Sequence, residues 1–297
     1  MKKYLYLSVL LCSYSYAHEP YVAPLGYNTT NTQIPVIASY AEEALNAEHA
    51  MKQTALNVIQ PDQSKLQVEA ASTLKSATVF DLALPQAGTY HLFSKASFPL
   101  KYVQHNKEWK MLFDVPADKA GKIAEREYVI PADFKKPPVP ITINREWSIQ
   151  SYISKEKTSP IQNNTDAAIQ VEFTTHPNSI TAQQPVQILI KKSGQALKNA
   201  ELLIRAQGQT DKQAQKFPVA QDGSATVTFP YSGQYLLEVS EAFNKTTQPV
   251  NQNYTIISLG VLIYVVMDGF DLGIGILFPF IQDHQELDVM MNTIAPV

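Results

Sequence analysis

Short segments in which apolar and polar residues alternate dominate the chain from residue 18 to about residue 254. Residues 79–84 alternate with period two, residues 85–88 (PQAG) carry turn signals, and residues 89–94 resume the alternation. Residues 110–115 repeat the pattern. Because side chains of a strand point alternately to its two faces, this pattern predicts half-buried β-strands joined by tight turns.

A second strand-rich unit covers residues 166–254. In each of three predicted strands every second residue is apolar, so that one face of the strand is apolar. The three sets are Val186, Ile188 and Ile190; Ala225, Val227 and Phe229; and Tyr235, Leu237 and Val239. Asp222-Gly223 is typical of a two-residue hairpin turn. The spacing of strands and turns predicts a small antiparallel sandwich.

The two units contain the same short element at matching places. Gly88 precedes Tyr90 by two residues at the start of one predicted strand, and Gly233 precedes Tyr235 in the same way. We therefore expect two sandwiches of one design, in each of which the tyrosine braces a corner. The predicted fold is mainly β, with two antiparallel Ig-like β-sandwich domains at residues 18–150 and 151–255.

Two segments depart from the strand pattern. Residues 39–53 are rich in Ala and Glu, which favours a short helix or lid with Glu42, Glu43 and Glu48 on its solvated face. Residues 131–140 contain four prolines and predict an extended connector.

Residues 256–281 form an almost unbroken apolar run. About 26 residues at ~1.5 Å per residue give roughly 39 Å of helix, which predicts a single transmembrane helix followed by a short tail at residues 282–297. Asp268 and Asp271 would share one helix face and are candidate functional residues, because carboxylates in a membrane span are costly. The expected helix-packing residues are Gly269, Gly273 and Gly275.

The first 17 residues predict a cleaved secretory signal. Lys2 and Lys3 precede an apolar core, and small residues end the segment at Ala17, so that His18 becomes the first residue of the mature chain. Cys12, the only cysteine, falls within this signal; a lipoprotein site is the alternative interpretation. We expect periplasmic domains anchored in the bacterial inner membrane.

Charge and motifs exclude several function classes. The net charge is −3 and no Lys/Arg cluster is present, so no nucleic-acid partner is expected. The sequence has no nucleophile elbow, no phosphate-binding loop and no zinc-spaced Cys/His set. Catalysis by this chain alone is therefore not expected.

The C-terminal segment resembles a known family. Residues 259–277, which include Asp268-Gly269-Phe270-Asp271, and residues 288–297 resemble the first helix and following segment of cytochrome bd quinol oxidase subunit II. The resemblance implies a non-haem subunit of a quinol:oxygen oxidoreductase, with the membrane and the haem-bearing subunit I as partners. A truncated oxidase subunit is thus the alternative function. The junction suggests that segments of two separate genes are joined, through deletion, frameshift or misassembly, with a true gene fusion as the alternative.

The β-rich part resembles a different family. Ala17-His18-Glu19-Pro20, the Gly88 and Tyr90 element, and Asp222-Gly223 followed by residues 233–237 (GQYLL) resemble bacterial periplasmic proteins of unknown function. That family is loosely linked to nickel or cobalt uptake, which implies an exported binding or accessory protein.

A mature N-terminal histidine has its own chemistry. The free amine and the imidazole of His18 can chelate one ion, and a second imidazole from His49, His91 or His105 would complete a nitrogen site suited to Cu(II) or Ni(II). Sequence spacing does not choose among these three partners. A binding module without a metal, which offers its loops to a partner protein, is the competing hypothesis.

Overall fold

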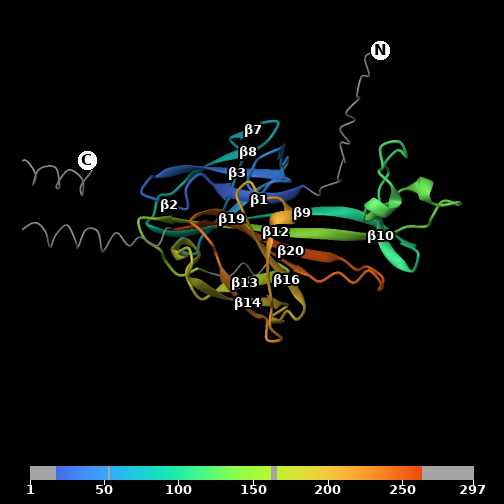
Figure 1. The fold of residues 1–297 in the computed structure, drawn as a ribbon. Helices are drawn as coiled ribbons and strands as arrows, with labels where there is room; N and C mark the ends of the chain where they lie inside the picture. Colours follow the sequence, from blue (N-terminus) through green and yellow to red (C-terminus); the bar gives the residue numbers. More distant parts are fainter. Residues whose placement is uncertain (1–17, 53, 162–165, 263–297) are drawn as a thin grey trace, which may run out of the picture.

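The computed structural model describes residues 18–52, 54–161 and 166–262 and is mainly β, as predicted (Figure 1). Its helices are four short 3₁₀ turns: η1 (Ile123–Glu125), η2 (Pro131–Asp133), η3 (Pro177–Ser179) and η4 (Asp211–Gln213). None of the helices in this described part has the length and hydropathy of a membrane span.

The strands form three sheets. The first sheet contains β1 (Glu19–Pro24), β3 (Gln33–Ala41), β4 (His49–Ala50), β7 (Ser72–Thr73) and β8 (Thr78–Ala83). The central sheet runs in the order β11 (Tyr128–Val129), β10 (Glu108–Leu112), β9 (Gly88–His105), β12 (Ile141–Lys155), β20 (Gln252–Val261), β19 (Gly233–Glu241), β16 (Ala200–Ala206) and β17 (Gln215–Phe217). Outside this order, β2 (Asn28–Thr29) pairs with β12, β5 (Leu56–Ile59) pairs with β9, and β6 (Lys65–Val68) pairs with β5. The third contains β13 (Ile169–Phe173), β14 (Pro185–Lys192), β15 (Gln195–Ala196) and β18 (Ser224–Thr228).

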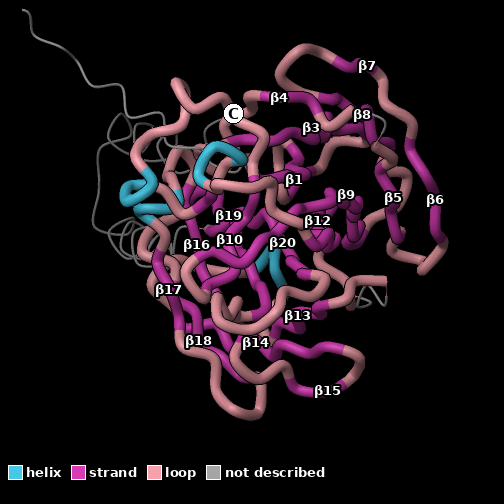
Figure 2. The backbone as a smooth tube through the Cα atoms, turned by 90° about the vertical axis from the view of Figure 1, so that its right-hand side faces the viewer, coloured by secondary structure: helices cyan, strands magenta, loops and turns pink. Residues whose placement is uncertain are grey.

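The central sheet is covered on both faces, so that the molecule has three layers (Figure 2). Ile256 of β20 lies in the core shared with the first sheet, and its neighbour Ile257 lies in the core shared with the third. Leu236 and Leu237 of β19 divide in the same way. Since successive side chains point to opposite faces, strands in this position must be apolar on both sides.

The double burial explains why the prediction of a membrane helix starting at Ile256 is wrong for residues 256–261. These residues belong to β20, which pairs parallel with β12 and antiparallel with β19. A strand buried on both faces reads as a continuous apolar run, which sequence pattern alone does not separate from a helix. Residues 263–281, and with them Asp268, Asp271, Gly269, Gly273 and Gly275, lie outside the described residues.

Both domain boundaries predicted from the sequence fall within strands. The boundary between residues 150 and 151 lies inside β12, and the boundary between residues 255 and 256 lies inside β20. Sheet pairing continues through both positions. The N-terminal and C-terminal halves of the β-rich part therefore contribute strands to one sheet.

The helix predicted for residues 39–53 is also wrong. Ser39 to Ala41 complete β3, residues 42–48 form a loop, and His49 and Ala50 form β4. The buried Ser39 hydroxyl donates to the carbonyl of Ser76 (2.7 Å) and lies 3.0 Å from the carbonyl oxygen of His49. The tertiary contacts of this segment outweigh its helix propensity.

The two Gly-x-Tyr elements form the expected corners. The Tyr90 hydroxyl donates to the carbonyl of Gln86 (2.9 Å) and accepts from its N–H (2.9 Å). The Tyr235 hydroxyl makes the same pair of bonds with Tyr231, at 2.9 and 3.4 Å. Gly88 and Gly233 both have positive φ, at 131° and 143°. The repeat thus places one tyrosine corner at the start of β9 and another at the start of β19.

The packing of Gly260 tests whether β20 is a strand. A Cβ on Gly260 would lie 2.6–2.9 Å from three atoms of the Tyr27 side chain, so Gly260→Ala should lower the free energy of unfolding by about 1–3 kcal/mol through overpacking. In a helix, the same substitution would raise it by up to about 1 kcal/mol. Urea titration followed by tryptophan fluorescence measures the sign. Gly121→Ala, which has no atom within 4 Å, is the control and should change little.

The two tyrosine corners predict similar losses of stability when either hydroxyl is removed. Tyr90→Phe and Tyr235→Phe each remove a buried hydroxyl that makes two backbone hydrogen bonds, so each should cost about 1–2 kcal/mol of unfolding free energy. Gln86→Ala keeps the backbone groups of the first corner and should cost under about 0.5 kcal/mol. Equal unfolding free energies for Tyr90→Phe and the parent chain would contradict this assignment.

Candidate metal site

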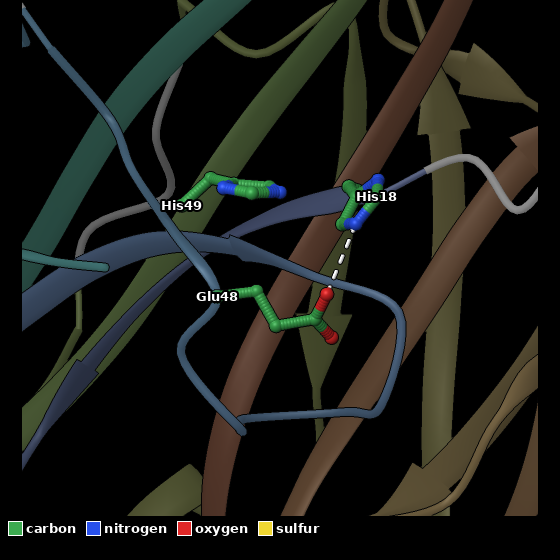
Figure 3. Close-up of side chains that lie close together, drawn as sticks. All are labelled: His18, Glu48 and His49. Atoms are coloured by element: carbon green, nitrogen blue, oxygen red, sulfur yellow. Dashed lines mark hydrogen bonds and ion pairs between the residues drawn. The ribbon is translucent and has the colours of Figure 1, made fainter. Parts of the chain in front are cut away.

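One group of potential metal ligands gathers where β1 begins. His18, Glu48 and His49 each offer one ligand atom, and these atoms lie within 4.8 Å of one another (Figure 3). The imidazole centroids of His18 and His49 are 4.9 Å apart, with the rings tilted by 56°. Of the three histidines considered as partners of His18, the structure places His49 beside it.

The pairing of three strands brings the two histidines together. His18 directly precedes β1, whose first residue, Glu19, pairs with Ala41 of β3. His49 begins β4 and pairs with Tyr40 of β3. β1 and β4 therefore deliver the two imidazoles to the same end of β3, although 30 residues separate His18 from Glu48 in sequence.

The loop of residues 42–48, which presents Glu48, is held by buried contacts. Leu45 is buried and has a φ of +62°, a conformation that costs free energy in a residue with a branched side chain. Its carbonyl accepts a hydrogen bond from the Tyr21 hydroxyl (3.2 Å). Ala44 exchanges backbone hydrogen bonds of 2.9 Å with Gln209 and Gly208, from the turn after β16. The loop is thus fixed from two sheets.

Glu48 is oriented through both of its carboxylate oxygens. Oε1 accepts from the backbone N–H of Glu42 (2.9 Å), and Oε2 lies 3.0 Å from Nε2 of His18. Partial desolvation opposes ionisation, but the Glu42 N–H and the neighbouring His18 outweigh it, so the pKa of Glu48 lies below its usual value. A negative charge therefore faces the His18 imidazole.

The site is open to solvent and remains accessible to an ion. The side chains of His18 and Glu48 are 37% and 36% exposed, and His49 is exposed. Two imidazoles with a carboxylate form a borderline ligand set that suits late first-row divalent metals. The three side chains could coordinate a metal through one nitrogen of each imidazole and one carboxylate oxygen. This coordination would not need the α-amine of a mature chain that begins at His18.

A buried cluster of charges anchors the strand that carries His18. Arg205 of β16 is 1% exposed and forms ion pairs with Glu19, with Asp211 (2.7 Å) and with Glu238 (3.7 Å). Because Glu19 follows His18, this guanidinium fixes the first residue of β1 from the central sheet. One cation thus faces three carboxylates in a mostly desolvated place.

The other two candidate ligands have different surroundings. His91 is buried, its Nε2 lies 2.9 Å from Oε1 of Gln150, and its ring stacks on Tyr152 at 4.6 Å. His105 ends β9 and packs edge-on against Phe134 at 5.6 Å. Neither belongs to a group of potential metal ligands among the described residues.

Sequence reasoning missed the part played by Glu48. It assigned the residue to the solvated face of a helix that does not form. The available signal was the pair Glu48-His49, two potential metal ligands adjacent in the sequence. Only the pairing of β1, β3 and β4 shows that this pair meets His18.

A comparison with protein families decides the membership of the chain. The model of the domain of unknown function DUF4198 matches residues 15–242, most of the chain. The chain belongs to the DUF4198 family. A second model, cytochrome bd terminal oxidase subunit II, matches residues 252–297. The second match starts at the first residue of β20, so this strand of the central sheet lies within the oxidase-like segment and outside the residues that match DUF4198.

The other comparisons do not bear on the DUF4198 assignment. No curated protein matches the chain. Among solved structures, the FN1–FN3 domains of chicken CNTN1 match with 10% identity over 83% of this chain and 99% of that chain, at a TM-score of 0.22. The D0–D1 domain of Intimin matches with 9% identity over 81% and 97% of the two chains, at a TM-score of 0.21. Similarity at this level does not establish a shared fold.

The buried charges around Arg205 predict that the stability of the fold depends on pH. Desolvation raises the pKa of Glu238 to about 7, and the attraction of Arg205 offsets this only in part. A carboxyl whose pKa is raised by folding stabilises the fold below its unfolded value of about 4.5, and this contribution is lost as pH rises through about 7. The unfolding free energy of the parent chain minus that of Glu238→Gln should therefore fall by about 1–3 kcal/mol between pH 4.5 and 8.

Urea titrations at a series of pH values measure this difference. Glu69→Gln, which changes an exposed carboxylate, should leave the pH dependence of the parent chain unchanged. A constant difference between the parent chain and Glu238→Gln across the whole range would contradict the raised pKa.

Proposed function

We propose that this DUF4198 protein is an exported metal-binding accessory protein that takes up Cu(II) or Ni(II) at His18 and His49. The observation that carries the proposal is the meeting of these two imidazoles at the residue where signal cleavage is predicted. In the mature chain the α-amine and imidazole of His18 supply two nitrogens, and His49 supplies a third. Nitrogen donors of this kind favour Cu(II) and Ni(II).

Several features of the site support the proposal. The strand pairing holds His49 and Glu19, the residue after His18, at the same end of β3, so little ordering of the backbone is needed for binding. The exposure of His18 and His49 lets an ion enter and leave. A chelate that needs a free amine forms only after the signal has been removed, which would confine metal loading to the exported protein.

Isothermal titration with Cu(II) and Ni(II) tests the proposal on the chain His18–Val297, purified in detergent and released from a fusion so that His18 is first. We expect one ion per chain, and a loss of affinity of at least about 10-fold in His18→Ala and in His49→Ala. His105→Gln is the control, because His105 lies outside the ligand group. An affinity of the parent chain no higher than that of His18→Ala would refute metal binding at this site.

The role of the amine has its own control. A chain that starts at Ser13 keeps His18 and His49 but converts the α-amine of His18 into an amide. We expect its Cu(II) affinity to fall about as far as that of His18→Ala. Unchanged affinity would instead favour coordination by the side chains of His18, Glu48 and His49 alone.

The oxidase-like segment favours a second proposal, namely attachment to a membrane. The match to cytochrome bd terminal oxidase subunit II suggests membrane association. Since β20 uses residues 252–261, a span would have to begin after Leu262, and residues 263–281 at ~1.5 Å each would give roughly 28 Å, close to the hydrocarbon thickness. Sedimentation of the chain with membranes after a carbonate wash tests this. Recovery in the soluble fraction would refute it.

A further inference from the structure

We infer that Glu48 positions His18 rather than binding the metal, and that it thereby leaves one coordination position for an exogenous small ligand. This inference rests on the proposed function. Its basis is the contact between Oε2 of Glu48 and Nε2 of His18, 3.0 Å long, on one edge of the imidazole (Figure 3).

The hydrogen bond fixes the tautomer of His18. An ionised carboxylate can only accept, so Nε2 must carry the proton that it donates to Glu48. The lone pair of the neutral ring then lies on Nδ1. This is the nitrogen that closes a six-membered chelate ring with the α-amine of the same residue. Outer carboxylates that hold the far nitrogen of a metal-binding histidine are a general device of metal sites.

The same contact keeps Glu48 away from the metal. Nδ1 and Nε2 lie on opposite edges of the imidazole, and their lone pairs point away from each other. A metal about 2 Å from Nδ1 therefore lies on the far side of the ring from Oε2. Oε1 is already bonded to the Glu42 N–H at 2.9 Å. Glu48 could reach the metal only by giving up the bond to His18.

The count of donors follows from this geometry. In the proposed site the amine and Nδ1 of His18 and one nitrogen of His49 would give three nitrogens, whereas Cu(II) prefers four tetragonal ligands. Among the described residues, Glu48 is the third potential ligand in the group that contains His18 and His49. Its two carboxylate oxygens are already bonded to His18 and to the Glu42 N–H. The fourth position is thus free for water, a small anion or a donor group of a partner that receives the metal.

Electron paramagnetic resonance and optical titration with azide test the inference on the Cu(II)-loaded chain His18–Val297. We expect azide to give a new charge-transfer band with the parent chain. Glu48→Gln keeps an acceptor oxygen for His18, so its copper spectrum and azide affinity should match those of the parent within about threefold. Glu48→Ala should keep the three-nitrogen spectrum but lose about 10- to 100-fold in Cu(II) affinity.

Different results separate the role inferred for Glu48 from the proposed uptake of metal. If Glu48 binds the metal, Glu48→Gln changes the copper spectrum and strengthens azide binding, and the inference is overturned while metal uptake stands. Absence of an azide band in the parent chain also overturns it. If Cu(II) binds no more tightly than to His18→Ala, both the proposed function and the inference fail. Glu69→Gln, which removes an exposed carboxylate charge outside the ligand group, is the control and should match the parent chain.

Discussion

The burial of both faces of the central sheet is the constraint on which the rest of this structure depends. Strands β12, β20 and β19 pack against a separate sheet on each side, and each core takes alternate residues from them. Neither outer sheet could bury its apolar face without this shared layer. Two buried serines of the layer bond to each other and to the first sheet: the Ser258 hydroxyl donates to the Val22 carbonyl (2.6 Å) and lies 2.8 Å from the Ser151 hydroxyl.

The same shared layer is tied to the candidate metal site through β16 and the turn that follows it. Arg205 extends from β16 to Glu19 at the start of β1, and the loop before Glu48 bonds to the turn after β16. The two sides of the site are therefore both tied to the C-terminal half of the fold. A charge buried in this way is costly to leave unpaired, so these contacts act together.

Local signals predicted much of the fold but not its assembly. The alternating segments and the Gly-x-Tyr elements identified β8, the start of β9, β14 and β19, because a half-buried strand leaves a period-two pattern. The pattern failed at β20, where burial on both faces erases the alternation. At the site, the chemistry of a terminal amine pointed to His18. Glu48 and His49 become neighbours of His18 only through the pairing between β1, β3 and β4. Such long-range pairing leaves no local trace.

The position of β20 has a consequence for how the chain reaches its native state. It is the last strand along the described chain, yet it lies between β12 and β19, and it pairs with β12 across a separation of 107 residues. Until β20 has been synthesised and delivered, the facing edges of β12 and β19 have no partner, and both cores lack part of their lining. Nonlocal parallel pairing of this kind is slow to form. Completion of the central sheet must therefore wait for the end of the β-rich part, and a chain in which β20 is not yet in place would expose two unpaired strand edges.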